Sequence, residues 1–100
     1  MKVILFRSYL KPGVDMDAYE RDTAAMYALV REIPGFIAAE DFTGDDGERL
    51  AVITFRDDES LRLWREHPEH RGAQARGRSV YYASYRLQIC DLERVASFGE

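Results

Sequence analysis

The stretch WREHPEHRGAQARGR, residues 64–78, holds the only tryptophan and both histidines of the chain within its first seven residues. Pro68 lies in its middle, and a proline inside a helix breaks or kinks it because it has no amide hydrogen to donate. We therefore expect one helix to end before Pro68 and a second to restart there and run to Arg76. The β-favouring residues 80–92 follow as the last strand of the chain. The stretch thus predicts a broken helix that leads into a closing strand.

Three further strand patterns lie upstream of this stretch. Residues 3–10 and residues 50–55 are rich in apolar and β-favouring side chains, and residues 36–43 form a strand pattern between them. The segment Gly-Asp-Asp-Gly at 44–47 is a turn signal. We therefore expect the second and third strands to form a hairpin.

A helix is expected between the first two strands. Its apolar side and its one threonine recur at steps of three and four: Met16, Tyr19, Thr23, Met26, Val30 and Ile33. Asp17 is the expected N-cap of this helix, and Pro34-Gly35 is its expected end. Asp57 or Asp58 is expected to cap the second helix. The order β-α-β-β-α-β is the ferredoxin-like plan, an α+β fold with an antiparallel sheet.

The first strand is apolar on both of its faces. Val3 and Leu5 share one parity, and Ile4 and Phe6 share the other. In a sheet with helices on one side and water on the other, apolar and polar side chains alternate more regularly along each strand. We therefore expect the second face to be covered by another copy of the chain, which predicts a homodimer with two sheets packed face to face.

The composition narrows the classes of partner. The net charge of −4 argues against nucleic acid and anionic membranes, because both require a basic field. Cys90 is the sole cysteine, so no internal disulfide can form, and its place in a strand predicts a small buried side chain. The apolar residues 3–6 are interrupted by Arg7 and are too few for a secretory leader. These features predict a cytoplasmic protein.

These patterns together resemble the antibiotic biosynthesis monooxygenase (ABM) family of the dimeric α+β barrel superfamily. Three groups of residues carry the resemblance: Pro34-Gly-Phe36, the segment Trp64…His67-Pro-x-His70…Gln74, and the Tyr81/Tyr85 strand. The resemblance covers nearly the whole chain and implies a single ABM-like domain over residues 1–100. It also implies a homodimer and a cofactor-independent monooxygenase that acts on a small aromatic or quinol-type compound.

This chain differs from the haem-degrading branch of the family at two positions. Trp64 matches a tryptophan on the second helix of that branch, but the position of its axial histidine is occupied here by Gln74, a poor iron ligand. The branch also uses an asparagine on the first strand, and this chain contains no asparagine. These departures argue against haem degradation, although His70 lies one helical turn before Gln74 and is an alternative ligand.

His70 is the candidate catalytic base, because an imidazole titrates near neutral pH without tuning. Cofactor-free oxygenation also needs a group that stabilises an oxyanion, for which Arg7 on the first strand and Arg86 on the last are candidates. Four aromatic residues are the expected walls of a substrate pocket: Phe6, Trp64, Tyr81 and Tyr85. Plain core packing is the competing interpretation of these aromatic side chains.

Two further interpretations stay open at this point. His67 and His70 are three residues apart, but Pro68 lies between them and the sequence indicates no third ligand, so no metal site is predicted. The same fold also supports a non-catalytic dimer that binds a small ligand or has a structural role. An enclosed aromatic cavity with His70 pointing inward would favour the enzyme, and a filled core with His70 in water would favour the alternative.

Overall fold

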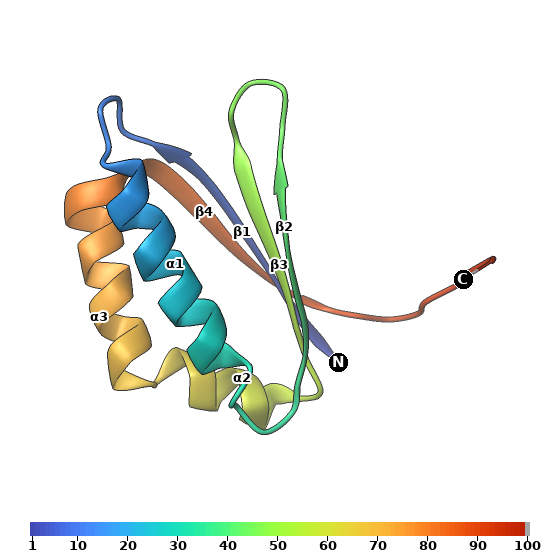
Figure 1. Ribbon diagram of the computed structural model, residues 1–100. Coiled ribbons are helices and arrows are strands. Elements are labelled where there is room, and N and C mark those ends of the chain that lie inside the picture. The colour runs from blue at the N-terminus through green and yellow to red at the C-terminus, as the bar shows by residue number, and fades with distance from the viewer. Residues whose placement is uncertain (100) are drawn as a thin grey trace.

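The computed structural model describes residues 1–99 as one antiparallel sheet with its helices on a single face (Figure 1). The elements follow in this order: β1 (Lys2–Leu10), α1 (Met16–Val30), β2 (Phe36–Thr43), β3 (Arg49–Phe55), α2 (Asp58–Arg65), α3 (Pro68–Arg76), a π-helical turn η1 (Gly77–Tyr81) and β4 (Tyr82–Asp91). The strands are arranged β2-β3-β1-β4 and all neighbours are antiparallel. This confirms the α+β, ferredoxin-like βαββαβ fold.

Helix α1 begins two residues earlier than the sequence pattern predicted. Asp15, not Asp17, is its N-cap: the Asp15 carboxylate accepts a hydrogen bond of 3.1 Å from the Ala18 amide. Asp15 has an extended backbone, whereas Asp17 already lies in the first helical turn. A cap must have this non-helical backbone for its side chain to reach the free amides, so the Asp17 prediction is wrong.

Helix α1 ends at Val30, four residues before the expected end at Pro34-Gly35, and a contact between layers explains the glycine of the turn that follows. Gly35 has a φ of +90°, and a Cβ built there would lie 1.8 Å from the Ser60 side-chain oxygen. Both the backbone conformation and the contact exclude any larger residue. Gly35 therefore lets the chain turn from α1 into β2 directly against the start of α2.

The predicted break at Pro68 is also confirmed. Helix α2 ends at Arg65, and Pro68 is the first residue of α3. His67 is the N-cap of α3, and its Nδ1 accepts a hydrogen bond of 3.2 Å from the Glu69 amide. His67 thus has a structural place at the helix junction.

Asp57 caps α2, as one of the two expected alternatives. Its carboxylate accepts hydrogen bonds from the Ser60 amide at 2.9 Å and the Ser60 hydroxyl at 2.8 Å. These bonds favour the charged form and lower the pKa of Asp57 to about 2 from its ordinary 3.8.

This cap predicts that the wild type and Asp57→Asn differ in stability by an amount that depends on pH. The asparagine keeps an acceptor oxygen but loses the charge. Because the pKa is lower in the folded state, the charge stabilises the fold above about pH 3.8. This contribution is lost as the pH falls through about 2. We expect the wild type to have the higher urea midpoint at pH 7, and the two midpoints to converge near pH 2. A constant difference across this pH range would contradict the assignment.

The core lies between the sheet and the helices. Its buried members come from both layers: Ile4, Val30, Phe55, Leu61 and Trp64. The helix-free face of the sheet carries Val3, Leu5 and Val52 at partial exposure. Cys90 is exposed on that same face, which contradicts the expectation that it is buried, because no element among residues 1–99 covers this side of β4.

The start of the last strand differs from the prediction. Residues 77–81 form the turn η1, so β4 begins at Tyr82 and not at Val80. The β1–β4 register then shifts: Leu10 pairs with Tyr82, while its neighbour Tyr9 pairs with Ser84. This β-bulge places Tyr82 on the face that carries Tyr85, although simple alternation assigns the two to opposite faces. Among residues 1–99, no helix is both long and apolar enough to cross a membrane.

Candidate functional site

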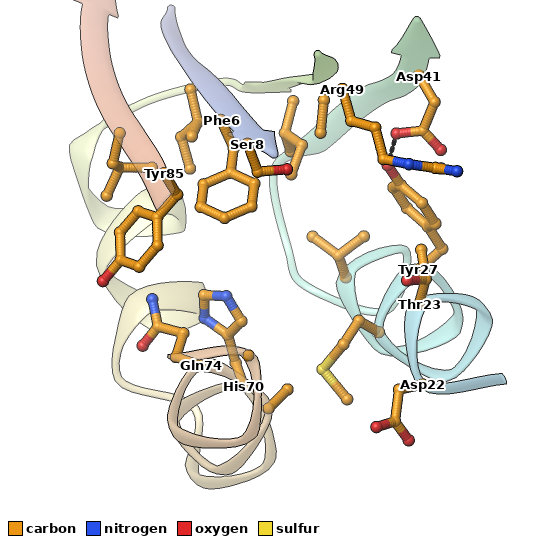
Figure 2. Close-up of a pocket in the computed structure, with 18 of the residues that line it drawn as sticks. Phe6, Ser8, Asp22, Thr23, Tyr27, Asp41, Arg49, His70, Gln74 and Tyr85 are labelled. Atoms are coloured by element: carbon orange, nitrogen blue, oxygen red, sulfur yellow. Dashed lines mark hydrogen bonds between the residues drawn. The ribbon is translucent and has the colours of Figure 1, made fainter. Parts of the chain in front are cut away.

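A cavity of about 480 Å³ lies between the sheet and the helices (Figure 2). Apolar side chains from both layers form much of its wall: Ile4, Phe6, Met26, Val30, Ile53 and Leu61. The cavity lies within the range of roughly 300–1,000 Å³ that is typical of small-molecule sites.

The structure brings five of the seven sequence-predicted site residues to this cavity. Phe6 projects from β1, Trp64 from α2, His70 from α3, and Tyr81 and Tyr85 from the η1–β4 segment. In Figure 2 the His70 ring points from its helix toward the space below Phe6 and Tyr85, with the Gln74 side chain beside it. These residues come from separate elements of the chain, and only the fold brings them close together.

His70 is held in one orientation by two contacts with Trp64. The two rings stack with their centroids 4.0 Å apart and their planes at 17°. The Nδ1 atom of His70 lies 3.1 Å from the Trp64 carbonyl oxygen. A carbonyl oxygen can only accept, so Nδ1 must carry the hydrogen of this bond. The lone pair of a neutral His70 ring is therefore on Nε2.

The environment of His70 favours its neutral form. Burial lowers the pKa of His70 below its ordinary value of 6.5, and the nearby His67 lowers it further, while the bond to the Trp64 carbonyl opposes both. At pH 7 the ring is thus uncharged and its Nε2 can accept a proton. This is the state that a general base requires.

Arg7 does not line this cavity, so the structure does not bring this candidate oxyanion partner together with His70. Adjacent strand residues point to opposite faces, so Arg7 lies behind the sheet when Phe6 faces the helices. The Arg7 guanidinium binds both carboxylate oxygens of Glu48, at 3.1 and 3.0 Å. It lines a smaller hollow of about 330 Å³ together with Arg86, its cross-strand partner.

Tyr81 reaches the cavity wall through a polar connection. Its hydroxyl donates a hydrogen bond of 2.7 Å to Asp22, which also accepts one of 3.3 Å from Arg76. The Tyr81 bond is the main cause of the lowered pKa of Asp22. The Tyr81 ring contacts Tyr19 edge to face at 5.3 Å. These contacts join α1 to the end of α3 and hold Tyr81 as a structural part of the wall.

Several polar residues of the cavity were missed by the sequence analysis. The Tyr27 hydroxyl donates to Asp41, and burial raises the pKa of Tyr27 well above its ordinary value. The Arg49 guanidinium lies over the Tyr19 ring, 5.3 Å from its centroid. The alternation of side chains along β3 could have identified Arg49. It places Arg49 on the same face of the strand as the apolar residue Ile53.

Taken together, these side chains form an aromatic site with a single neutral imidazole. Phe6, Trp64 and His70 all line the cavity, and stacked or edge-to-face contacts with such rings favour flat aromatic ligands. A proton on the ligand can pass to Nε2 of His70 if it lies within hydrogen-bond reach.

Solved structures share this architecture. The structure of Rv0793 from Mycobacterium tuberculosis superposes with a TM-score of 0.83 over 96% of this chain and 98% of that one, at 18% identity. SnoaB from Streptomyces nogalater, a cofactor-independent oxygenase, superposes with a TM-score of 0.77, with 94% of each chain covered at 12% identity. At these identities the likeness shows the fold alone.

Sequence similarity is stronger in two other comparisons. YqjZ of Bacillus subtilis, an uncharacterized protein, is 32% identical over 82 residues, which are 82% of this chain and 72% of YqjZ. The family model for antibiotic biosynthesis monooxygenase matches residues 1–76, a segment that includes Trp64 and His70 and ends before β4. The sequence match over three quarters of the chain and the shared βαββαβ architecture agree, and the protein belongs to the antibiotic biosynthesis monooxygenase family.

Proposed function

We propose that the protein is a cofactor-independent monooxygenase that oxidises a small aromatic or quinol-type compound, with His70 as the catalytic base. One observation carries this proposal: the neutral His70 ring, fixed by the Trp64 carbonyl, projects into an aromatic-lined cavity. The oxygenase activity of SnoaB, which has the same fold, agrees with it.

The proposed reaction needs only the substrate, O₂ and one base. A substrate phenol gives its O–H proton to Nε2 of His70, and the electron pair that remains is delocalised onto a ring carbon. This carbon transfers electrons to O₂ and forms a C–O bond, and the peroxide takes the proton back from His70. The same carbon then loses its hydrogen as the O–O bond breaks and hydroxide leaves, so that a carbonyl and water form. One phenol and one O₂ give one quinone and one water.

The chain's own residues supply three functions in this scheme. His70 moves the proton, the rings of Phe6 and Trp64 orient the flat substrate, and the apolar wall excludes water from the reactive anion. A non-catalytic binding protein would need the same cavity but not an imidazole with a fixed tautomer. The held His70 ring is therefore what favours the enzyme over a ligand-binding or structural dimer.

Oxygen uptake tests the proposal. Purified protein treated with a chelator and freed of small molecules is mixed with a panel of polyphenols and quinols in an oxygen electrode. We expect substrate-dependent uptake, with one O₂ consumed for each quinone measured by absorbance. Ligand binding without uptake above the uncatalysed rate would overturn the catalytic assignment and support the non-catalytic alternative.

We also propose that the helix-free face of the sheet packs against the same face of a second copy. Val3, Leu5 and Val52 lie there at partial exposure, and no helix within residues 1–99 covers them. Leu5→Glu would bury a charge in such an interface, so we expect a dimer mass for the wild type and a monomer mass for Leu5→Glu in sedimentation equilibrium. Leu63→Glu is the matched control, because Leu63 is exposed on α2. A monomeric wild type would contradict the proposal.

A further inference from the structure

Two irregularities of the backbone bring Tyr82 to the cavity. The π-helical turn η1 precedes it, and the β-bulge opposite Leu10 rotates it onto the cavity face of β4. Single π-turns and β-bulges both re-aim side chains and are frequent at functional sites. Without the bulge, Tyr82 would lie on the face of Ser84, away from the cavity.

Gly77 provides the space that the Tyr82 ring occupies. A Cβ at Gly77 would lie 2.5 and 2.9 Å from two carbons of this ring. Gly77 has a φ of −56°, a helical value that every residue adopts, so its backbone does not require glycine. A glycine in a helical conformation costs stability relative to alanine. The close approach of the Tyr82 ring is therefore the physical reason for glycine at this buried position.

The Tyr82 ring lines the cavity toward one end of the sheet. It pairs with Leu10, beyond the Ser8–Tyr85 pair, whereas Ile4 and Trp64 belong to the packed core at the opposite end. Three aromatic rings surround it, at centroid distances of 5.3 Å for Phe6, 5.9 Å for Tyr85 and 6.3 Å for Tyr19. The ring is thus fixed between these neighbours on one side and Gly77 on the other.

We propose that Tyr82 is the end wall of the cavity, and that Gly77, by its lack of a side chain, sets the position of this wall and thereby the longest fused-ring ligand the site accepts. The inference rests on the proposed function, in that the ligand is aromatic, and it adds that the η1–β4 junction determines ligand length. Tyr82 and Gly77 act through the shape of the cavity and take no part in proton transfer.

The test compares ligands of two lengths under argon, so that binding is read without turnover. Dihydroxynaphthalene has two fused rings and dihydroxyanthraquinone has three, and quenching of Trp64, the only tryptophan, reports each dissociation constant from within the cavity. In Gly77→Ala the displaced ring shortens the cavity. We expect its preference for the two-ring over the three-ring compound to rise at least about tenfold relative to the wild type. In Tyr82→Ala the wall is removed, and the preference should move by a similar factor toward the three-ring compound.

Gly72→Ala is the matched control. Gly72 lies in α3, the helix that leads into η1. A Cβ at Gly72 would meet only an Arg76 nitrogen at 3.6 Å, and Gly72 does not line the cavity. This variant should keep the wild-type ratio of the two affinities. Equal changes for both ligands in Gly77→Ala and Tyr82→Ala, or no binding of either ligand to the wild type, would overturn the inference. A shifted ratio without oxygen uptake by the wild type would uphold the end wall and refute only the oxygenase.

Discussion

Replacing His70 with glutamine is expected to lower the rate of substrate-dependent oxygen uptake about 100- to 10,000-fold, the usual contribution of a general base. Glutamine fills a similar space beside Trp64 but has no lone pair that accepts a proton at neutral pH. The effect should fall on kcat, with a smaller change in KM, because the aromatic walls that bind the substrate remain. Uptake in the oxygen electrode, with the quinone product followed in parallel, measures both constants.

His67→Gln is the matched control for this prediction. His67 is the other histidine of the chain, three residues away, but it caps α3 and does not line the cavity. Its loss should weaken the helix junction and leave kcat within about twofold of the wild type. If the two variants lose activity equally, or if His70→Gln keeps wild-type uptake, His70 is not the base.

The pH profile gives a second check on His70. Burial lowers its pKa below 6.5, so the base form should predominate at all pH values above this. We expect kcat/KM to fall on the acid side with a midpoint below pH 6.5 and to show no loss from His70 between pH 7 and 8. The acid limb should disappear in His70→Gln. A midpoint well above 6.5 would contradict the environment described for this ring.

Phe55→Ala is expected to lower the free energy of unfolding by about 3–5 kcal/mol, the usual cost of truncating a fully buried phenylalanine. Phe55 has no exposed surface and belongs to the core cluster with Val30 and Leu61. Its ring also contacts Phe36 edge to face, at 6.3 Å between centroids. Truncation would leave a cavity that the surrounding strands and helices cannot fill. Urea unfolding followed by Trp64 fluorescence, at a fixed protein concentration, measures the loss.

Phe98→Ala is the control for the core prediction, because the Phe98 side chain is fully exposed in the chain. Removing an exposed side chain usually changes stability by less than about 0.5 kcal/mol. A loss at Phe98 comparable to that at Phe55 would show that the C-terminal residues pack in solution against another surface. A loss below about 1 kcal/mol at Phe55 would contradict the described core.

Sequence patterns predicted local structure correctly where a residue type permits only one backbone arrangement. Pro68 cannot continue a helix, and α3 begins there. Gly35 is the turn residue after α1, and its positive φ shows why glycine is required. The N-cap of α1 was misplaced because Asp15 and Asp17 both satisfy the pattern, and only the backbone conformation distinguishes them.

The candidate site was predicted in part. The aromatic residues and His70 were identified, whereas Arg7 was included against the alternation of its own strand, since Phe6 and Arg7 must face opposite sides. Simple alternation along residues 80–92 would place Tyr82 on the face opposite to Tyr85, because a β-bulge has no signal in these residues themselves. Arg49 was overlooked because the sequence around a single charged residue in a strand does not show which rings or charged groups it contacts in the fold.

The sequence by itself determined the order of strands and helices, the break at Pro68 and the family, because these depend on residue type and on spacing along the chain. The tertiary structure alone decided that His70 stacks on Trp64 with Nδ1 at a carbonyl, that Arg7 binds Glu48 behind the sheet, and that Tyr82 enters the cavity. Each of these depends on contacts between elements, or on a one-residue shift of register. Such contacts arise only when the layers pack, so no local pattern of residues records them.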